Sequence, residues 1–448
     1  MLTVDAALAR LSQAIDHAKR LGADAADAVY IGDASTSVQV RLGALEDIGR
    51  SEGEEIGLRL FVGQRSASVS TSDLSPRALE TVVERAAAMA REAPEDPYAG
   101  LAPEDRLLRG PVPDLDLRDA GEPTAEALKA RALEAEDAAR AVQGVTNSEG
   151  ASASAGRAII ALATSGGFGG GYTTSSHGLS ASVIAGEGAG MQRDYAYHSA
   201  RHAADLDTPA EIGERAGRRA VDRLNPRKIG TGQLPVVFDP RVGSGLIGHL
   251  IGAITGSAVA RGTSFLLDRL GTKVFADGIR ILDDPRRPRG LRSRPFDGEG
   301  LPTAAHAIID DGVLTTWLLD SASARQLGLQ PTGHASRGVG GPPGAGPSNL
   351  HMEPGTVTRD ALIGDIKRGF YVTELIGQGL NPVTGDYSRG AAGFLIEDGA
   401  IGPAVAEVTI AGNVKDMFLN LTPADDLRFR HATNVPTIRV DGMTVAGA

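Results

Sequence analysis

Apolar residues near the N-terminus recur at helical spacing, and the pattern then changes to alternation. Between residues 4 and 21 the spacing predicts one amphipathic helix that ends near Gly22. Apolar and polar residues then alternate in short segments separated by Gly or Asp, which predicts a half-buried antiparallel sheet. The predicted strands are 27–32, 36–43, 45–51, 55–63 and 65–71. With a second helix at 75–92, residues 1–95 are predicted to form an N-terminal α+β domain.

A segment rich in Pro, Asp and Glu follows, and it marks a domain boundary because it cannot hold a regular element. We place a linker, or an extended crossing segment, at residues 96–123. Beyond it the patterns again predict helices beside antiparallel strands, so residues 124–227 form a middle α+β domain. The run GGFGGG at 166–171 lacks the Lys-Ser/Thr of a P-loop, and we interpret it as a hairpin connection.

Residues 228–448 are predicted to form a β-rich C-terminal domain. A buried strand at 233–240 leads into an apolar helix, 242–256, which has glycine at five positions. Glycine at this density costs a helix roughly 1 kcal/mol per interior site, so close backbone approach is expected there. Asp-Gly stands between apolar runs at 311–312 and 398–399 and predicts two hairpins. The fold class is therefore α+β, with helix-flanked antiparallel sheets followed by a strand-rich, barrel-like domain.

Composition then excludes several classes of protein. The 448 residues are 42% hydrophobic and 23% charged, as in an ordinary folded soluble protein. No apolar stretch is long enough to span a membrane, and Asp5 and Asp16 interrupt any signal-peptide core, so we expect a cytoplasmic protein. The chain has no cysteine, which excludes disulfides, thiolate metal ligands and cysteine nucleophiles. The net charge of -11 argues against direct binding to nucleic acid, and the short basic run at 283–294 is predicted to be an exposed loop.

The histidines do not form a zinc motif. His198 and His202 are four residues apart, but Ser199 stands where an HExxH motif needs glutamate, so we predict a surface pair. His249 lies in the glycine-rich helix, where no second ligand or carboxylate base follows it within a turn. We interpret His249 as a packed or peptide-facing side chain, and we predict neither a catalytic residue nor a bound metal in this chain.

The most unusual segment is 372–399, where glycines and small polar residues interrupt predicted strands. Glycine within a strand marks a bulge or the close approach of another backbone. A peptide added to the edge of a sheet would need such an approach, and so would glycine-rich turns inside a small barrel. The residues alone leave both interpretations open.

Several motifs across the chain resemble those of the TldD/PmbA family of bacterial metallopeptidases, and of its PmbA (TldE) branch in particular. They include the N-terminal segment EDIGRSEGEEIGLRLFVG and, in family order, residues 264–268, 295–300, 317–319, 332–335, 385–394 and 410–417. The resemblance implies a three-part architecture and a heterodimer of a TldD-like and a PmbA-like chain. It also implies cleavage of unfolded peptides in an enclosed chamber, with zinc held by the TldD-like partner.

In TldD-like chains an HExxxH motif lies on the helix that corresponds to residues 245–256, and a cysteine farther along is the third zinc ligand. Here Gly248, His249 and Ala253 stand in place of His, Glu and His, and no cysteine exists. The resemblance therefore implies a supporting role rather than a catalytic one. Candidate peptide-binding residues are His249, Arg261, Gln378, Asp386, Tyr387 and Arg389.

Two other functions stay open at this point. The chain could be a stand-alone or homodimeric peptide-binding protein without catalysis. The family's historical label, modulator of DNA gyrase, suggests instead a regulator of a nucleic-acid enzyme, which the acidic charge allows only indirectly.

Overall fold

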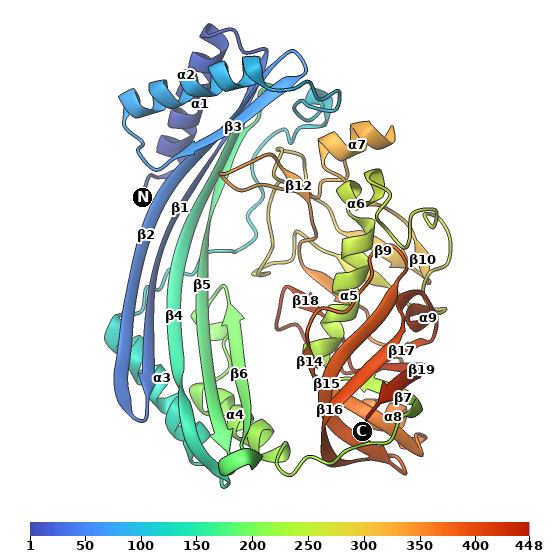
Figure 1. The fold of residues 1–448 in the computed structure, drawn as a ribbon. Coiled ribbons are helices and arrows are strands. Elements are labelled where there is room, and N and C mark those ends of the chain that lie inside the picture. Colours follow the sequence, from blue (N-terminus) through green and yellow to red (C-terminus); the bar gives the residue numbers. More distant parts are fainter. Residues whose placement is uncertain (448) are drawn as a thin grey trace.

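A computed structural model describes residues 1–447, and its N-terminal half is dominated by one curved antiparallel sheet, a half-barrel (Figure 1). Six strands are hydrogen-bonded in the order β3-β2-β1-β4-β5-β6. Their bounds are β1 Ala25–Arg41, β2 Ala44–Val62, β3 Arg65–Thr71, β4 Val145–Thr164, β5 Gly169–Ala185 and β6 Gln192–Ala200. The sheet therefore continues from the first part of the chain into the second across the segment 96–123.

The strands are longer than the alternation predicts. Segments 27–32 and 36–43 belong to the single strand β1, and 45–51 and 55–63 belong to β2. The predicted breaks are wrong because Asp33 and Gly53 are paired with each other inside the ladder, so neither makes a turn. The run 166–171 does connect two strands, since β4 ends at Thr164 and β5 begins at Gly169, which confirms the hairpin connection.

Four helices pack on the half-barrel, two toward each end (Figure 1). They are α1 Val4–Arg20, α2 Pro76–Glu92, α3 Ala125–Arg140 and α4 Pro209–Asp222. Helices α3 and α4 touch backbone to backbone at Gly213, where an added Cβ would lie 2.1 Å from the carbonyl oxygen of Ala135. Small residues on both helices therefore allow α3 and α4 to pack closely against each other.

The C-terminal part contains a closed five-stranded barrel. The strands follow the order β16-β15-β14-β7-β19, and a further pairing of β16 with β19 closes the ring, while β17 adds to β19. The bounds are β7 Gly232–Phe238, β14 Arg368–Ile376, β15 Asp386–Glu397, β16 Ala400–Asn413, β17 Leu421–Pro423 and β19 Ile438–Ala446. With the helix-flanked half-barrel, this barrel confirms the predicted α+β class.

A smaller sheet and short helices complete this part of the chain. The sheet has the order β10-β9-β8-β13-β18, and β11 pairs with β12 beside it. Its strands are β8 Ile281–Asp283, β9 His306–Asp310, β10 Val313–Leu314, β13 Leu350–Met352 and β18 Thr433–Asn434, with β11 Ala335–Ser336 and β12 Gly344–Ala345 separate. The helices are α5 Pro240–Ile254, α6 Gly256–Ala260, α7 Ser321–Leu327, α8 Arg359–Gly364 and α9 Val414–Leu419.

Both predicted Asp-Gly hairpins are confirmed. Asp311 and Gly312 join β9 to β10, and Asp398 and Gly399 join β15 to β16. All four residues have positive φ, between 46° and 77°, which is the backbone that two-residue hairpin turns require. The register of both hairpins therefore follows from local turn chemistry.

Buried ion pairs join the barrel side to the half-barrel. Near one end, Arg59 of β2 and Arg337 of the β11–β12 connection both pair with Asp27 of β1. Near the other end, Asp194 of β6 forms an ion pair with Arg241 of α5, with 2.8 Å between the carboxylate oxygen and the guanidinium nitrogen. These pairs cross between the predicted domains 1–95, 124–227 and 228–448, whose boundaries stay predictions. No helix within the described residues is long and apolar enough to cross a membrane.

The turn 295–300 buries two carboxylates, Asp297 and Glu299, without an ion pair to either among the described residues. Asp297 accepts backbone hydrogen bonds from Glu299 and Leu301. Glu299 accepts hydrogen bonds from the backbone N–H and the hydroxyl of Ser321, at 2.9 and 2.7 Å. Burial, followed by the charge of Asp297, raises the pKa of Glu299 to about 7.

We predict that Glu299→Gln removes a pH dependence of stability. The folded pKa of Glu299 lies above its unfolded value, so its stabilising contribution is complete below about pH 4.5 and is lost as pH rises through about 7. The free energy of unfolding of the natural chain should fall relative to Glu299→Gln by on the order of 3 kcal/mol over that window. Denaturant titrations at several pH values measure it. The exposed Glu397→Gln is the control, and an equal pH dependence in both variants would contradict the account.

Candidate functional site

Helix α5 buries one face in the C-terminal core and leaves the other face open. Leu246, Ile247 and Leu250 are at most 1% exposed and pack in the core. On the other face stand Gly245, Gly248 and Gly252, where an added Cβ would meet nothing within 4 Å. Packing inside this chain therefore does not require these glycines. They leave a smooth strip of helix backbone that a second chain can approach closely.

His249 stands beside this strip and packs against Tyr387 of β15. The two rings lie edge to face, with centroids 5.7 Å apart and planes at 70°. Burial, and then the charge of Arg389, lowers the pKa of His249, so its imidazole is neutral at pH 7. A neutral imidazole can both donate and accept a hydrogen bond, and either suits a peptide group.

Tyr387 and Arg389 each have a buried polar atom without a hydrogen-bond partner among the described residues. Tyr387 is 2% exposed, and its hydroxyl makes no hydrogen bond of accepted geometry. Burial raises the pKa of Tyr387 to about 12, against a smaller opposing effect of the Arg389 charge. Arg389 is half-buried, and its Nε has no partner. Unpaired buried polar atoms are uncommon in proteins, and an ordered water, a ligand or a partner chain can supply the missing group.

The structure thus brings together three of the six candidate residues, His249, Tyr387 and Arg389. Asp386 precedes Tyr387 on β15 but is exposed, and it accepts hydrogen bonds from Thr384 at 2.6 Å and Asn413 at 3.1 Å. These two hydrogen bonds lower the pKa of the Asp386 carboxyl, which braces the β14–β15 connection.

The remaining two candidates, Gln378 and Arg261, are exposed. Gln378 lies in the β14–β15 connection, and Arg261 is the C-terminal cap of α6. Neither side chain makes a hydrogen bond or ion pair within residues 1–447, and the roles of all six residues stay predictions.

The glycines of segment 372–399 have an internal explanation at two positions. An added Cβ on Gly379 would lie 1.6 Å from the carbonyl oxygen of Ser388, and one on Gly393 would lie 1.9 Å from that of Tyr371. The barrel itself needs these two glycines, because β15 lies close to the β14–β15 connection at Gly379 and β14 lies close to β15 at Gly393. The space that a second chain could use is instead along α5.

The pair His198 and His202 is not a surface pair, and that prediction is wrong. His198 lies on β6 and is 8% exposed, and its Nδ1 accepts the backbone N–H of Asp207 at 3.0 Å. His202 follows the strand, and its Nε2 lies 3.2 Å from Asp116. Helical spacing does not apply to them because the segment is a strand and a turn, so each ring reaches a different carboxylate.

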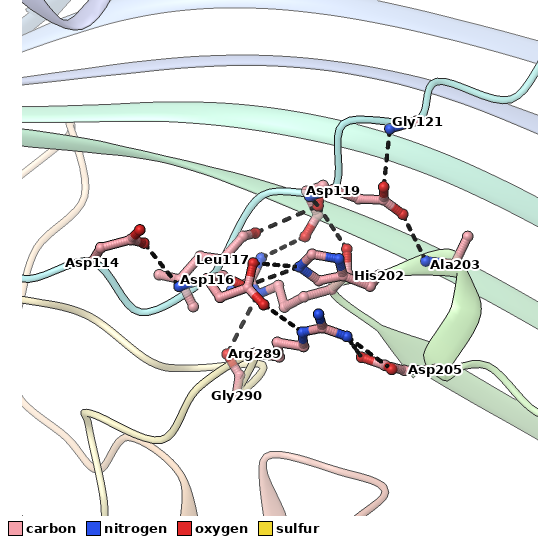
Figure 2. Close-up of polar contacts among 12 residues, drawn as sticks. Asp114, Asp116, Leu117, Asp119, Gly121, His202, Ala203, Asp205, Arg289 and Gly290 are labelled. Carbon is pink, nitrogen blue, oxygen red and sulfur yellow. Dashed lines mark hydrogen bonds and ion pairs between the residues drawn. The ribbon is translucent and has the colours of Figure 1, made fainter.

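Figure 2 shows what His202 does. Asp116 from the crossing segment contacts both His202 and Arg289, and Arg289 also reaches Asp205 at 3.2 Å. Asp119 accepts backbone hydrogen bonds from Gly121 and Ala203. This network ties segment 114–121 to the end of β6 and to the basic loop 283–294. The predicted exposure of that loop is confirmed only in part, because Arg289 is exposed whereas Asp283, Gly290 and Ser293 are buried. Arg289 has a structural role in this network.

A long antiparallel half-barrel joined to a closed five-stranded barrel places the protein in a class of solved structures with the same fold. One, described as a candidate modulator of DNA gyrase from Bacteroides thetaiotaomicron, is 29% identical, covers 100% of both chains and superposes with a TM-score of 0.92. TldE from Thermococcus kodakarensis, 22% identical, covers 98% of this chain and 100% of its own, with a TM-score of 0.87, and shows the fold alone.

Sequence comparison then identifies the family. Models for the PmbA/TldA metallopeptidase domain 1, central domain and C-terminal domain match residues 26–90, 118–224 and 231–447. Metalloprotease PmbA of Escherichia coli O157:H7 is 39% identical over 98% of this chain and 96% of its own. A Metalloprotease PmbA homolog of Haemophilus influenzae is 38% identical over 98% and 95%. The chain belongs to the PmbA/TldD metallopeptidase family, which confirms the resemblance.

This chain lacks the zinc-binding residues that are expected of the catalytic branch. His249 is the one residue of α5 with a zinc-donor side chain, and Gly248 and Ala253 offer no donor atom. With no cysteine in the sequence, the third ligand has no counterpart either. The chemistry of α5 is therefore that of a packed histidine beside open helix backbone.

We predict that Tyr387→Phe leaves stability nearly unchanged, whereas Tyr371→Phe lowers it. The Tyr387 hydroxyl has no partner to lose, but the Tyr371 hydroxyl donates to Asp239 at 2.9 Å. Loss of that hydrogen bond to a carboxylate should lower the free energy of unfolding by roughly 1.5–3 kcal/mol. Denaturant unfolding compares the two variants. An equal loss in both would mean that the Tyr387 hydroxyl is paired inside this chain.

Proposed function

We propose that this chain is the non-catalytic subunit of a heterodimeric zinc metallopeptidase of the cytoplasm. In this role it guides unfolded peptides to the zinc site of a TldD-like partner and closes the chamber around them. The observation that carries the proposal is the open glycine face of α5 beside His249 and Tyr387. This helix occupies the place of the zinc-binding helix in the catalytic branch, and it offers backbone access instead of metal ligands.

The chemistry of the face suits an extended peptide. A peptide presents alternating N–H and C=O groups, so it needs both donors and acceptors along its path. The neutral His249 ring, which is partly exposed beside the glycine face and packs on Tyr387, supplies either. The glycines at 245, 248 and 252 let the peptide backbone lie close to the helix without a side chain between them.

Reconstitution with a TldD-like chain tests the proposal. The two chains should form a complex that cleaves an unfolded peptide, and this chain alone should leave the same peptide intact. If no complex forms, and the chain binds peptide alone or as a homodimer, the function is that of a stand-alone peptide-binding protein. Cleavage by the isolated chain would contradict both functions.

We predict that Gly248→Leu raises the stability of the chain but lowers peptide turnover by the complex. Leucine is the better helix former and meets no neighbour at Cβ, so the free energy of unfolding should rise by roughly 0.5–1 kcal/mol. The same side chain would stand in the proposed peptide path, so peptide turnover by the complex should fall at least about ten-fold, the equivalent of roughly 1.4 kcal/mol. Turnover and denaturant unfolding are measured on the same preparation.

The matched control is Gly364→Leu at the end of α8, where an added Cβ also meets nothing within 4 Å. It should leave peptide turnover unchanged. Unchanged turnover in Gly248→Leu as well would remove the open face of α5 from the peptide path.

A further inference from the structure

A pocket away from the α5 glycine face is lined by arginine. It has a volume of about 500 Å³ and lies between α4, the first turn of α5, β14 and the segment that leads into β18. Two of its arginines come from α4, one each from α5 and α8, and two from the segment before β18. They are Arg215, Arg219, Arg241, Arg359, Arg428 and Arg430. Such a concentration stands out in a chain of net charge -11.

Three of these arginines are neutralised inside the protein. Asp207 pairs with Arg215 at 2.9 Å and also with Arg430. Asp194 forms an ion pair with Arg241 at 2.8 Å. The other three, Arg219, Arg359 and Arg428, make no ion pair with any carboxylate in the described part of the chain, residues 1–447.

The two carboxylates of the pocket wall are already engaged by neutral donors. Asp239 caps α5 through the backbone N–H of Arg241, at 3.0 Å, and accepts the hydroxyl of Tyr371 at 2.9 Å. Asp426 accepts the backbone N–H and the hydroxyl of Thr437 at 2.8 and 2.7 Å. With Asp194 and Asp207, four carboxylates face six guanidinium groups, which leaves an excess of two positive charges.

The unpaired arginines are held in place and partly desolvated. Arg219 donates to the carbonyl oxygen of Tyr195 at 3.2 Å, and burial followed by the charge of Arg241 lowers its pKa. The guanidinium of Arg359 lies over the ring of Tyr371, 5.2 Å from its centroid. Arg428 is exposed at the rim. Two partly buried cations and one exposed cation therefore line the cavity, beside the wall carboxylates Asp239 and Asp426.

We propose that this pocket binds the phosphate group of a small phosphorylated molecule. Guanidinium forks match the oxygens of phosphate in bidentate geometry, and an excess of two charges matches a phosphate dianion better than a single carboxylate. The volume lies in the range of small-molecule sites and leaves room for more than the phosphate itself. His249 is ten residues beyond the Asp239 cap, roughly 15 Å along the helix, so the phosphate site is separate from the proposed peptide path.

Calorimetric titration of the full chain with inorganic phosphate and with pyrophosphate tests the site, at ionic strength held constant with chloride. We expect saturable binding at one site per chain. The double variant Arg359→Ala/Arg428→Ala should weaken it at least about ten-fold, because two charge-assisted contacts are lost. The control Arg218→Ala, on the exposed side of α4 and paired with Glu214, should bind as the natural chain does. Arg428→Ala alone changes an exposed side chain and keeps the test independent of folding.

Three results of the titrations with phosphate and pyrophosphate would overturn the phosphate site. They are the absence of saturable binding, equal affinity in the natural chain and the double variant, and loss of binding in Arg294→Ala, whose side chain lines a different pocket. Tighter binding of a peptide with a free C-terminal carboxylate, lost when that carboxylate is an amide, would also overturn it in favour of a carboxylate site. Because the titration uses this chain without a partner, its outcome does not depend on the proposed peptidase role.

Discussion

The buried pairing of Asp194 with Arg241 fixes the start of α5 against the half-barrel, and both candidate sites depend on where that helix lies. Asp194 is 2% exposed on the last strand, and Arg241 reaches both of its oxygens, at 2.8 and 3.0 Å. Arg223 from the end of α4 approaches the same carboxylate at 3.3 Å. Removing one member of such a pair leaves a buried charge and costs roughly 3–5 kcal/mol. The open glycine face and the arginine pocket both lie along the helix that this pairing positions.

Local chemistry made much of the fold predictable, and the rest depended on long-range packing. The Asp-Gly hairpins were predictable because their turns need positive φ. The close backbone approach expected along the 242–256 helix is not made inside this chain at Gly245, Gly248 and Gly252, where an added Cβ would meet nothing within 4 Å. The breaks in β1 and β2 were mispredicted because Asp33 and Gly53 look like turn residues, whereas their neighbours on both sides pair into one ladder. The position of His198 and His202 similarly followed from a strand that their helical spacing did not reveal.

One candidate site was partly predictable from the sequence, whereas the other depends on long-range packing. His249, Tyr387 and Arg389 were chosen as polar groups in glycine-rich segments, and the structure places them together because β15 passes beside α5. The arginine pocket had no counterpart in the sequence. Its residues lie between positions 215 and 430, separated by several strands, and the acidic net charge pointed away from an anion site. Only tertiary packing brings such residues together, so no spacing pattern in the sequence could predict the pocket.

The central claim is that a partner supplies the metal chemistry and this chain supplies the surface that presents the peptide. Zinc content per chain, measured after purification in zinc-containing buffer and removal of loosely bound metal, tests this most directly. The account predicts no stoichiometric zinc in the isolated chain and about one zinc per heterodimer once a TldD-like chain is bound. One zinc per isolated chain would contradict it, because the ligands would then have to come from this chain's own histidines and carboxylates.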